Sequence, residues 1–319
     1  MTLRHRLGAL VYDWPRFLRH IGGNWARIRN RDETLAVDAR GARCDWLYTS
    51  ELHVAKVYPL AGRMLMRRAF RDWPIALRDE PLSASATPDV SFIIGHRGLA
   101  RLPNLLSTLR SIAGQRDVAI ECIVVEQSTE REVEQALPPW VRYLHTPVAA
   151  DLDYCRSATF NVAARIARGS LLIAHDNDML VPERYAAEIH ARAAQGAQFI
   201  DPKRFIFYLD ERERLIQVIQ NLKGGSIAAT KEAYFAIGGF DEDFVGWGGE
   251  DLEFWERARA YGQVYEYGWL PLLHRWHAPQ PGKLQQESAP AQLRYHEVKV
   301  IPAAERIARL RSANFPNEK

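Results

Sequence analysis

From residue 90 onward, short apolar segments alternate with segments of helical periodicity, and this alternation limits the possible folds more than any other feature. Residues 90–94, 120–125 and 171–174 are apolar and rich in β-branched side chains, as buried strands are. Residues 99–112 place four leucines at helical spacing. The series is completed by a short strand at residues 141–144 and a helix at 161–168. Alternating strands and helices predict a doubly wound α/β fold around a mostly parallel sheet, which binds ligands beyond the carboxyl ends of its strands.

The flanking regions divide the chain into four predicted parts. Residues 79–89 contain two prolines and small polar side chains without periodicity, which is typical of a linker. We therefore predict a basic, aromatic-rich N-terminal region with a helix near residues 52–70, a linker, an α/β domain and a helical C-terminal extension broken by Pro302. Their bounds are residues 1–80, 81–89, 90–285 and 286–319.

Charge and composition exclude several classes of protein. The 319 residues carry 42 basic and 39 acidic side chains, and the net charge of +3 is too small to indicate a nucleic-acid partner. Three scattered cysteines form neither a disulfide framework nor a metal motif, which favours a reducing compartment. No apolar run approaches the roughly 20 residues of a spanning helix, so we expect a cytoplasmic protein.

The first 31 residues depart from this balance. They contain seven arginines and one acid, Asp13, with Trp14, Phe17 and Trp25 among them. Two interpretations stay open. The segment lies as an amphipathic helix on the anionic inner face of a membrane, or it is a solvated basic face whose aromatic side chains pack onto the main domain.

Two clusters of acids offer sites for chemistry. Asp176 and Asp178 follow the strand at residues 171–174, where an Asp-x-Asp pair can bind a divalent cation and the phosphates that it bridges. Such pairs also occur in ordinary turns. The second cluster, Glu250 and Asp251, opens a helix that Gly262 is expected to end. Helix capping explains one of these acids, but not the glycines and the tryptophan directly before them.

The run Gly246-Trp-Gly-Gly-Glu-Asp251 resembles the acceptor-side motif of inverting galactosyltransferases, and of bacterial chondroitin-type polymerases in glycosyltransferase family 2. The resemblance covers about residues 89–285. It includes Gly224-Gly-Ser226, the segment from Arg156 to Asn161, Asp176-Asn-Asp178, and a histidine before a Pro-x-Pro-Gly-Lys sequence. The spacing between the two acidic clusters matches as well.

This resemblance implies a GT-A fold that binds a nucleotide sugar, with uridine as the expected nucleoside, together with Mn²⁺ or Mg²⁺. Asp251 is implied as the catalytic base, and Gly225, Trp247 and Glu250 as acceptor-binding residues. The implied donor-binding residues are Arg97, Glu126, Arg156 and Asp176, and the implied metal ligands are Asp176, Asp178 and His277. His274 lies in the same window, and the sequence after His277 favours His277.

The sequence thus predicts a metal-dependent inverting glycosyltransferase. It would move a sugar from a UDP donor to a hydroxyl of a glycan or lipid-linked glycan, in the synthesis of a bacterial surface polysaccharide or glycoconjugate. Two other hypotheses remain: a metal-dependent phosphoesterase or pyrophosphatase that uses the same acids, and a non-catalytic glycan-binding module.

Overall fold

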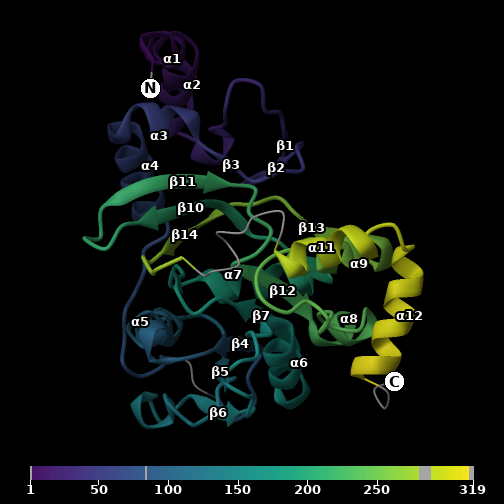
Figure 1. Ribbon diagram of the computed structural model, residues 1–319. Coiled ribbons are helices and arrows are strands. Elements are labelled where there is room, and N and C mark those ends of the chain that lie inside the picture. Colours follow the sequence, from purple (N-terminus) through teal and green to yellow (C-terminus); the bar gives the residue numbers. More distant parts are fainter. Residues whose placement is uncertain (1, 83–84, 280–288, 316–319) are drawn as a thin grey trace.

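The computed structural model describes residues 2–82, 85–279 and 289–315, and its centre is a seven-stranded sheet (Figure 1). The strand order is β13-β9-β12-β7-β4-β5-β6. Its parallel half contains β7 (Leu171–His175), β4 (Val90–His96), β5 (Ile120–Glu126) and β6 (Arg142–His145). The other half contains β12 (Ser226–Thr230), β9 (Phe199–Ile200) and β13 (Val264–Tyr265). Strand β12 runs antiparallel to both of its neighbours, β7 and β9, and β13 pairs with β9 in parallel. The four predicted strands are confirmed, and four of the six strand pairs are parallel.

Helices cover both faces of this sheet. One face packs on α5 (Leu102–Ala113) and α7 (Tyr185–Ala194). The other packs on α6 (Arg156–Ile166), α8 (Lys231–Ala236) and α9 (Glu250–Tyr261). The predicted helix at residues 99–112 begins with a 3₁₀ turn, Leu99–Arg101, and α6 begins five residues before its predicted start.

A second sheet, which the sequence analysis did not predict, lies against the first (Figure 1). Its order is β3-β11-β10-β14-β8, and its pairs are antiparallel except for β10 with β14. The strands are β3 (Ser50–Glu51), β8 (Met179–Leu180), β10 (Lys203–Leu209), β11 (Leu215–Gln220) and β14 (Leu270–His274).

The N-terminal region packs on this second sheet. Its elements are α1 (Leu3–Gly8), a π-helical turn (Ala9–Asp13), α2 (Trp14–Ile21), β1 (Leu35–Val37), β2 (Ala42–Cys44), α3 (His53–Val57) and α4 (Pro59–Asp72). Phe17 and Trp25 are buried in one cluster with Phe205 and Phe207 of β10. The single helix predicted near residues 52–70 is divided at Tyr58, because the residue before a proline disfavours helical backbone.

Two C-terminal helices, α11 (Pro290–Val298) and α12 (Ala303–Asn314), pack against α9, and Pro302 separates them as predicted. The predicted boundary at residues 285–286 and the Pro-Gly-Lys sequence at 281–283 lie outside the described residues. Among the described helices, none has the length and apolar character that crossing a bilayer requires.

Candidate active site

A cavity of about 340 Å³ lies at the carboxyl end of β7, next to the second sheet. Three loops contribute to its lining: the turn from β7 to β8, the segment before β12, and the glycine-rich loop that leads into α9. The predicted site residues that line it are Arg156, Asp176, Asp178, Gly225, Trp247, Glu250, Asp251 and His277. Residues far apart in the sequence therefore meet in one site.

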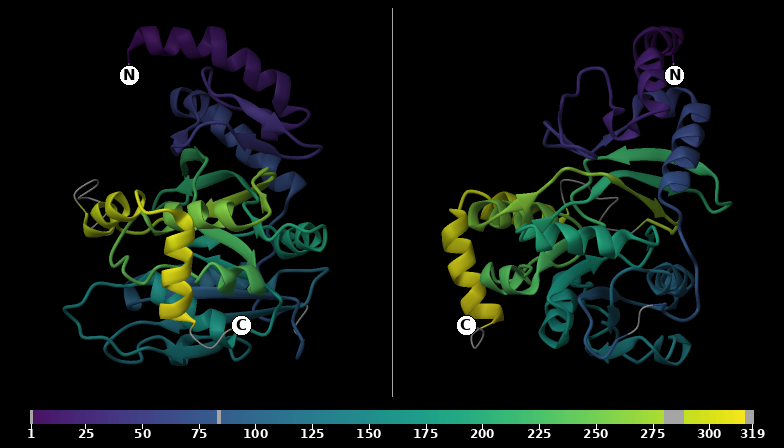
Figure 2. Two further views of the ribbon diagram at one scale, coloured as in Figure 1. Left: turned by 90° about the vertical axis from the view of Figure 1, so that its right-hand side faces the viewer. Right: turned by 180° about the vertical axis from the view of Figure 1, so that it is seen from behind.

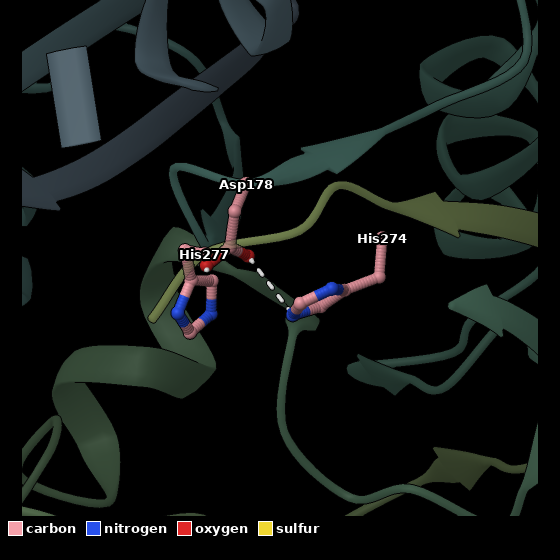
Figure 3. A group of neighbouring side chains, drawn as sticks. All are labelled: Asp178, His274 and His277. Atoms are coloured by element: carbon pink, nitrogen blue, oxygen red, sulfur yellow. Dashed lines mark ion pairs between the residues drawn. The ribbon is translucent and has the colours of Figure 1, made fainter. Parts of the chain in front are cut away.

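Asp178, His274 and His277 form a cluster that could hold a metal ion at one side of this cavity (Figure 3). One ligand atom from each lies within 4.8 Å of the others. His277 Nε2 is 3.1 Å from Asp178 Oδ2, and His274 Nε2 is 3.8 Å from Asp178 Oδ1. The pairing of β14 with β8 explains the arrangement, because it sets His274 opposite Met179, the residue after Asp178.

The donor atoms of this cluster fit a divalent transition metal. Asp178 Oδ1 is buried and accepts no hydrogen bond within the described ranges. Burial alone would raise the pKa of Asp178, but the hydrogen bond from His277 and the charges of His274, His277 and Arg101 lower it to about 2. The carboxylate is therefore ionised. Two imidazoles beside one carboxylate suit a divalent transition metal better than Mg²⁺, which takes oxygen ligands.

Arg101, which the sequence analysis did not single out, also contacts this cluster. Its Nη1 donates to Asp178 Oδ2 at 3.2 Å, and its Nη2 donates to His277 Nδ1 at 3.0 Å. The residue ends the 3₁₀ turn before α5 and faces the cavity. It provides a positive charge beside the metal ligands, where a phosphate group could be bound.

Arg156, the first residue of α6, joins the two predicted acidic clusters. Its Nη1 donates to Asp176 Oδ1 at 2.5 Å, and its Nη2 is 3.3 Å from Glu250 Oε1 and also donates to Asp251 Oδ1. Although burial lowers the pKa of Arg156, the three carboxylates raise it well above its usual value. The guanidinium is therefore charged and holds the acids in place.

Asp251 has the properties of a base that works near neutral pH. Burial, with the nearby negative charges of Glu250 and Asp176, raises its pKa to about 7 against the opposing effect of Arg156. It lies in the first turn of α9, beside Gly224. A Cβ atom at Gly224 would be 2.1 Å from Asp251 Oδ2, so only glycine allows this close approach.

The glycine-rich loop before α9 presents Trp247 to the cavity, and Glu250 follows it as the first residue of α9. Gly246, Gly248 and Gly249 all have φ between +88° and +105°, which glycine adopts without strain. This backbone turns the chain sharply and directs the acids of α9 toward Arg156.

The structure places two predicted donor-binding residues outside the cavity lining. Arg97 is half exposed and donates to the carbonyl oxygens of Leu152 and Ala150. Glu126 is buried and accepts hydrogen bonds from the Tyr143 hydroxyl and from the backbone amides of residues 132 and 133. Its carboxylate therefore anchors the loop after β5.

Asp176 also differs from its predicted role as a metal ligand. It lines the cavity, but its carboxylate pairs with Arg156, and it does not belong to the cluster of Asp178, His274 and His277. The sequence analysis treated His274 and His277 as alternatives, whereas the structure brings both to Asp178.

Comparison with known proteins finds a family match and several similar proteins, of which two are described here. Residues 216–267 match the family described as the N-terminal domain of galactosyltransferase. The "Probable N-acetylgalactosaminyltransferase 9" of Caenorhabditis elegans is 41% identical over 56 residues, which are 18% of this chain and 9% of that protein. The catalytic domain of Drosophila beta1,4-galactosyltransferase 7, in complex with xylobiose, is 19% identical over 58% of this chain and 64% of that chain, with a TM-score of 0.34. The matched segment of this chain contains Trp247, Glu250 and Asp251, and its sequence is of the galactosyltransferase type.

Proposed function

We propose that this protein is a metal-dependent inverting glycosyltransferase. It moves a sugar from a nucleotide donor, expected to be UDP-linked, to a hydroxyl of a glycan or lipid-linked glycan. The observation that carries the proposal is the shared cavity, in which the Asp178–His274–His277 cluster and the Glu250–Asp251 pair lie on either side of Arg156 and Asp176. The galactosyltransferase-type sequence at residues 216–267 supports the same reaction class.

The residues of the donor side are suited to a leaving diphosphate. A divalent cation held by Asp178, His274 and His277 would offset negative charge on the phosphates. Arg101 adds a fixed positive charge beside the cluster. Such preorganised charges stabilise the transition state because they need no reorientation as the leaving group departs.

The acceptor side supplies the base. The acceptor oxygen attacks the anomeric carbon while the bond from that carbon to the nucleotide phosphate breaks, and the hydroxyl proton passes to Asp251. Inversion follows from this single displacement. Glu250 hydrogen-bonds the acceptor, and Trp247 provides an apolar face for its sugar ring. Holding both sugars in one cavity supplies a further part of the acceleration.

Thermal stabilisation by nucleotide sugars tests the donor site. The purified protein is melted with a panel of nucleotide sugars, each with Mn²⁺ and with chelator, because a ligand of the folded state raises the melting temperature. The names of the matched relatives place UDP-galactose and UDP-N-acetylgalactosamine first in the panel. A shift that needs Mn²⁺ is expected for one donor. No shift with any nucleotide would contradict the proposal.

Turnover tests the proposed base. Asp251→Asn should reduce release of UDP by about 10²-fold or more, the range of general-base catalysis. Asp32→Asn is a matched control, since Asp32 is exposed, pairs with the adjacent Arg31 and lies outside the cavity lining. Asp251→Asn turnover at the wild-type rate would show that the base is another group.

Product analysis separates this reaction from phosphoester hydrolysis. A phosphoesterase would release UDP and free sugar, and a pyrophosphatase would release UMP and a sugar 1-phosphate. Either reaction would proceed without a sugar acceptor and would tolerate Trp247→Ala. The transferase requires an acceptor hydroxyl and loses acceptor affinity in that variant. We place the reaction in the synthesis of a surface polysaccharide or glycoconjugate, as the sequence resemblance implies.

A further inference from the structure

The N-terminal helical segment, residues 3–21, exposes a continuous set of large apolar side chains. They recur at helical spacing along α1, the π-helical turn and α2, and each is between 49% and 74% exposed. The side chains are Leu3, Leu7, Leu10, Val11 and Leu18, and we call this set the apolar face. On the surface of a soluble protein, large apolar side chains are usually exposed singly, whereas five lie along this short segment.

The opposite side of the same segment is firmly attached to the protein. Ala9, Asp13 and Phe17 are buried, and Phe17 belongs to the cluster that contains Phe205. Asp13 pairs with His53 at 2.8 Å. The helical segment therefore has a defined orientation, and it lies at the edge of the molecule (Figure 2). The side chains of its apolar face are exposed.

The charge around the apolar face is strongly positive. Residues 1–31 contain seven arginines and one acid, the buried Asp13. Within the described part of the chain, Arg31 is the one of the seven that pairs with a carboxylate, that of Asp32. Burial and the charges of Arg29, Arg27, Arg19 and Arg16 lower the pKa of His20, as expected where positive charge is not balanced.

We propose that the apolar face of residues 3–18 docks on an anionic lipid surface. A lipid bilayer offers both complements at once: an acyl region for the leucines and valine, and phosphate groups for the arginines beside them. A protein partner would have to present acidic groups around an apolar groove to match the same surface. The docking needs neither the metal cluster nor turnover, so it does not depend on the proposed reaction.

Vesicle sedimentation with the full chain tests this proposal. The protein is mixed with sucrose-loaded vesicles of phosphatidylcholine alone, or of phosphatidylcholine with phosphatidylglycerol. We expect sedimentation with the anionic vesicles, and a loss of binding at high salt because screening weakens the arginine–phosphate attraction. Substitution of Arg4 or Arg19 by Gln should lower the partition coefficient about fivefold for each charge removed.

The apolar part is tested with Leu7→Ser/Leu10→Ser, which should reduce partitioning by about tenfold or more. Val300→Ser is a matched control, because Val300 is 77% exposed but lies in the C-terminal region. Circular dichroism and melting temperature verify that each variant is folded.

Two results would overturn the proposal. In the first, the wild-type protein stays in the supernatant with anionic vesicles, or Leu7→Ser/Leu10→Ser sediments as the wild type does. In the second, light scattering shows a dimer that the same double substitution dissociates, without vesicle binding by the wild type. The apolar face would then be a contact between two copies of this chain.

Discussion

Gly224→Ala should disable the proposed base while leaving the fold intact. The new Cβ would lie 2.1 Å from Asp251 Oδ2, whereas an ordinary contact begins near 3.4 Å, so the carboxylate must move by more than 1 Å. A displacement of this size costs about 10²-fold in rate, equivalent to about 2.7 kcal/mol of transition-state stabilisation. Gly224 does not have positive φ, and the obstructed atom ends a short side chain. The free energy of unfolding should therefore fall by only about 1 kcal/mol.

The assay is release of UDP from the donor that stabilises the protein, measured with its acceptor at saturating donor. Gly22→Ala is the matched control, since no atom lies within 4 Å of its added Cβ and its φ is −79°. We expect the control to turn over normally, and both variants to retain the Mn²⁺-dependent thermal shift. If Gly224→Ala is active within about threefold of the wild type, the position of Asp251 beside Gly224 does not matter for catalysis, and the assigned base is wrong.

Three further predictions concern pH, metal binding and stability. The pKa of Asp251 is raised to about 7, and a general base must be deprotonated to act. We therefore expect kcat/KM to rise roughly tenfold per pH unit below pH 7 and to level off above it. A flat profile from about pH 5.5 to 8.5 would exclude Asp251 as the base. Asp178→Asn or His274→Ala should weaken Mn²⁺ binding at least about tenfold in calorimetry, and unchanged affinity would place the metal elsewhere. Glu253 is fully buried and pairs with Arg257 at 2.6 Å and with Arg306 of α12. Glu253→Gln should therefore lower the free energy of unfolding, measured by urea titration, by about 3–5 kcal/mol. A loss below about 1 kcal/mol would show that these ion pairs are not needed for stability.

The sequence was informative where structure depends on neighbouring residues. The strands of the parallel half of the main sheet follow from apolar runs. The start of α9 at Glu250 follows from the glycines before it, and its end follows from Gly262. Asp176 and Asp178 were placed correctly after the carboxyl end of β7, because the apolar run at residues 171–174 marks the buried strand that precedes them.

Contacts between distant segments could not be predicted in the same way. The pairing of β8 with β14 joins residues more than 90 positions apart, and it brings His274 to Asp178 while the chain returns His277 to the same carboxylate. The sequence around each of these strands does not show that the two strands pair. Local patterns therefore left the two histidines as alternatives, and the second sheet was not predicted at all.

Two predicted donor-binding residues at strand ends lie outside the cavity lining. Arg97 and Glu126 lie at or just after the carboxyl ends of β4 and β5, where a donor site was expected. Successive side chains of a strand point to opposite faces, but the local sequence does not show which face borders the cavity. Both side chains instead bind loops, and Arg101 enters the cavity from the following turn.

The charges in the cavity imply an order of binding. Four carboxylates line it, and the cationic side chains among the lining residues are those of Arg101, Arg156 and Lys223. Lys223 is also 3.5 Å from Glu266, so its charge is shared with another carboxylate. The carboxylates beside the Asp178 cluster repel the diphosphate of a nucleotide, which brings at least two further negative charges. A divalent cation on the Asp178 cluster would offset this repulsion, so we expect the nucleotide to bind more weakly without it. We expect the affinity for UDP to depend steeply on Mn²⁺, whereas Mn²⁺ should bind without UDP. Equal affinity for UDP with and without chelator would contradict this electrostatic account of the site.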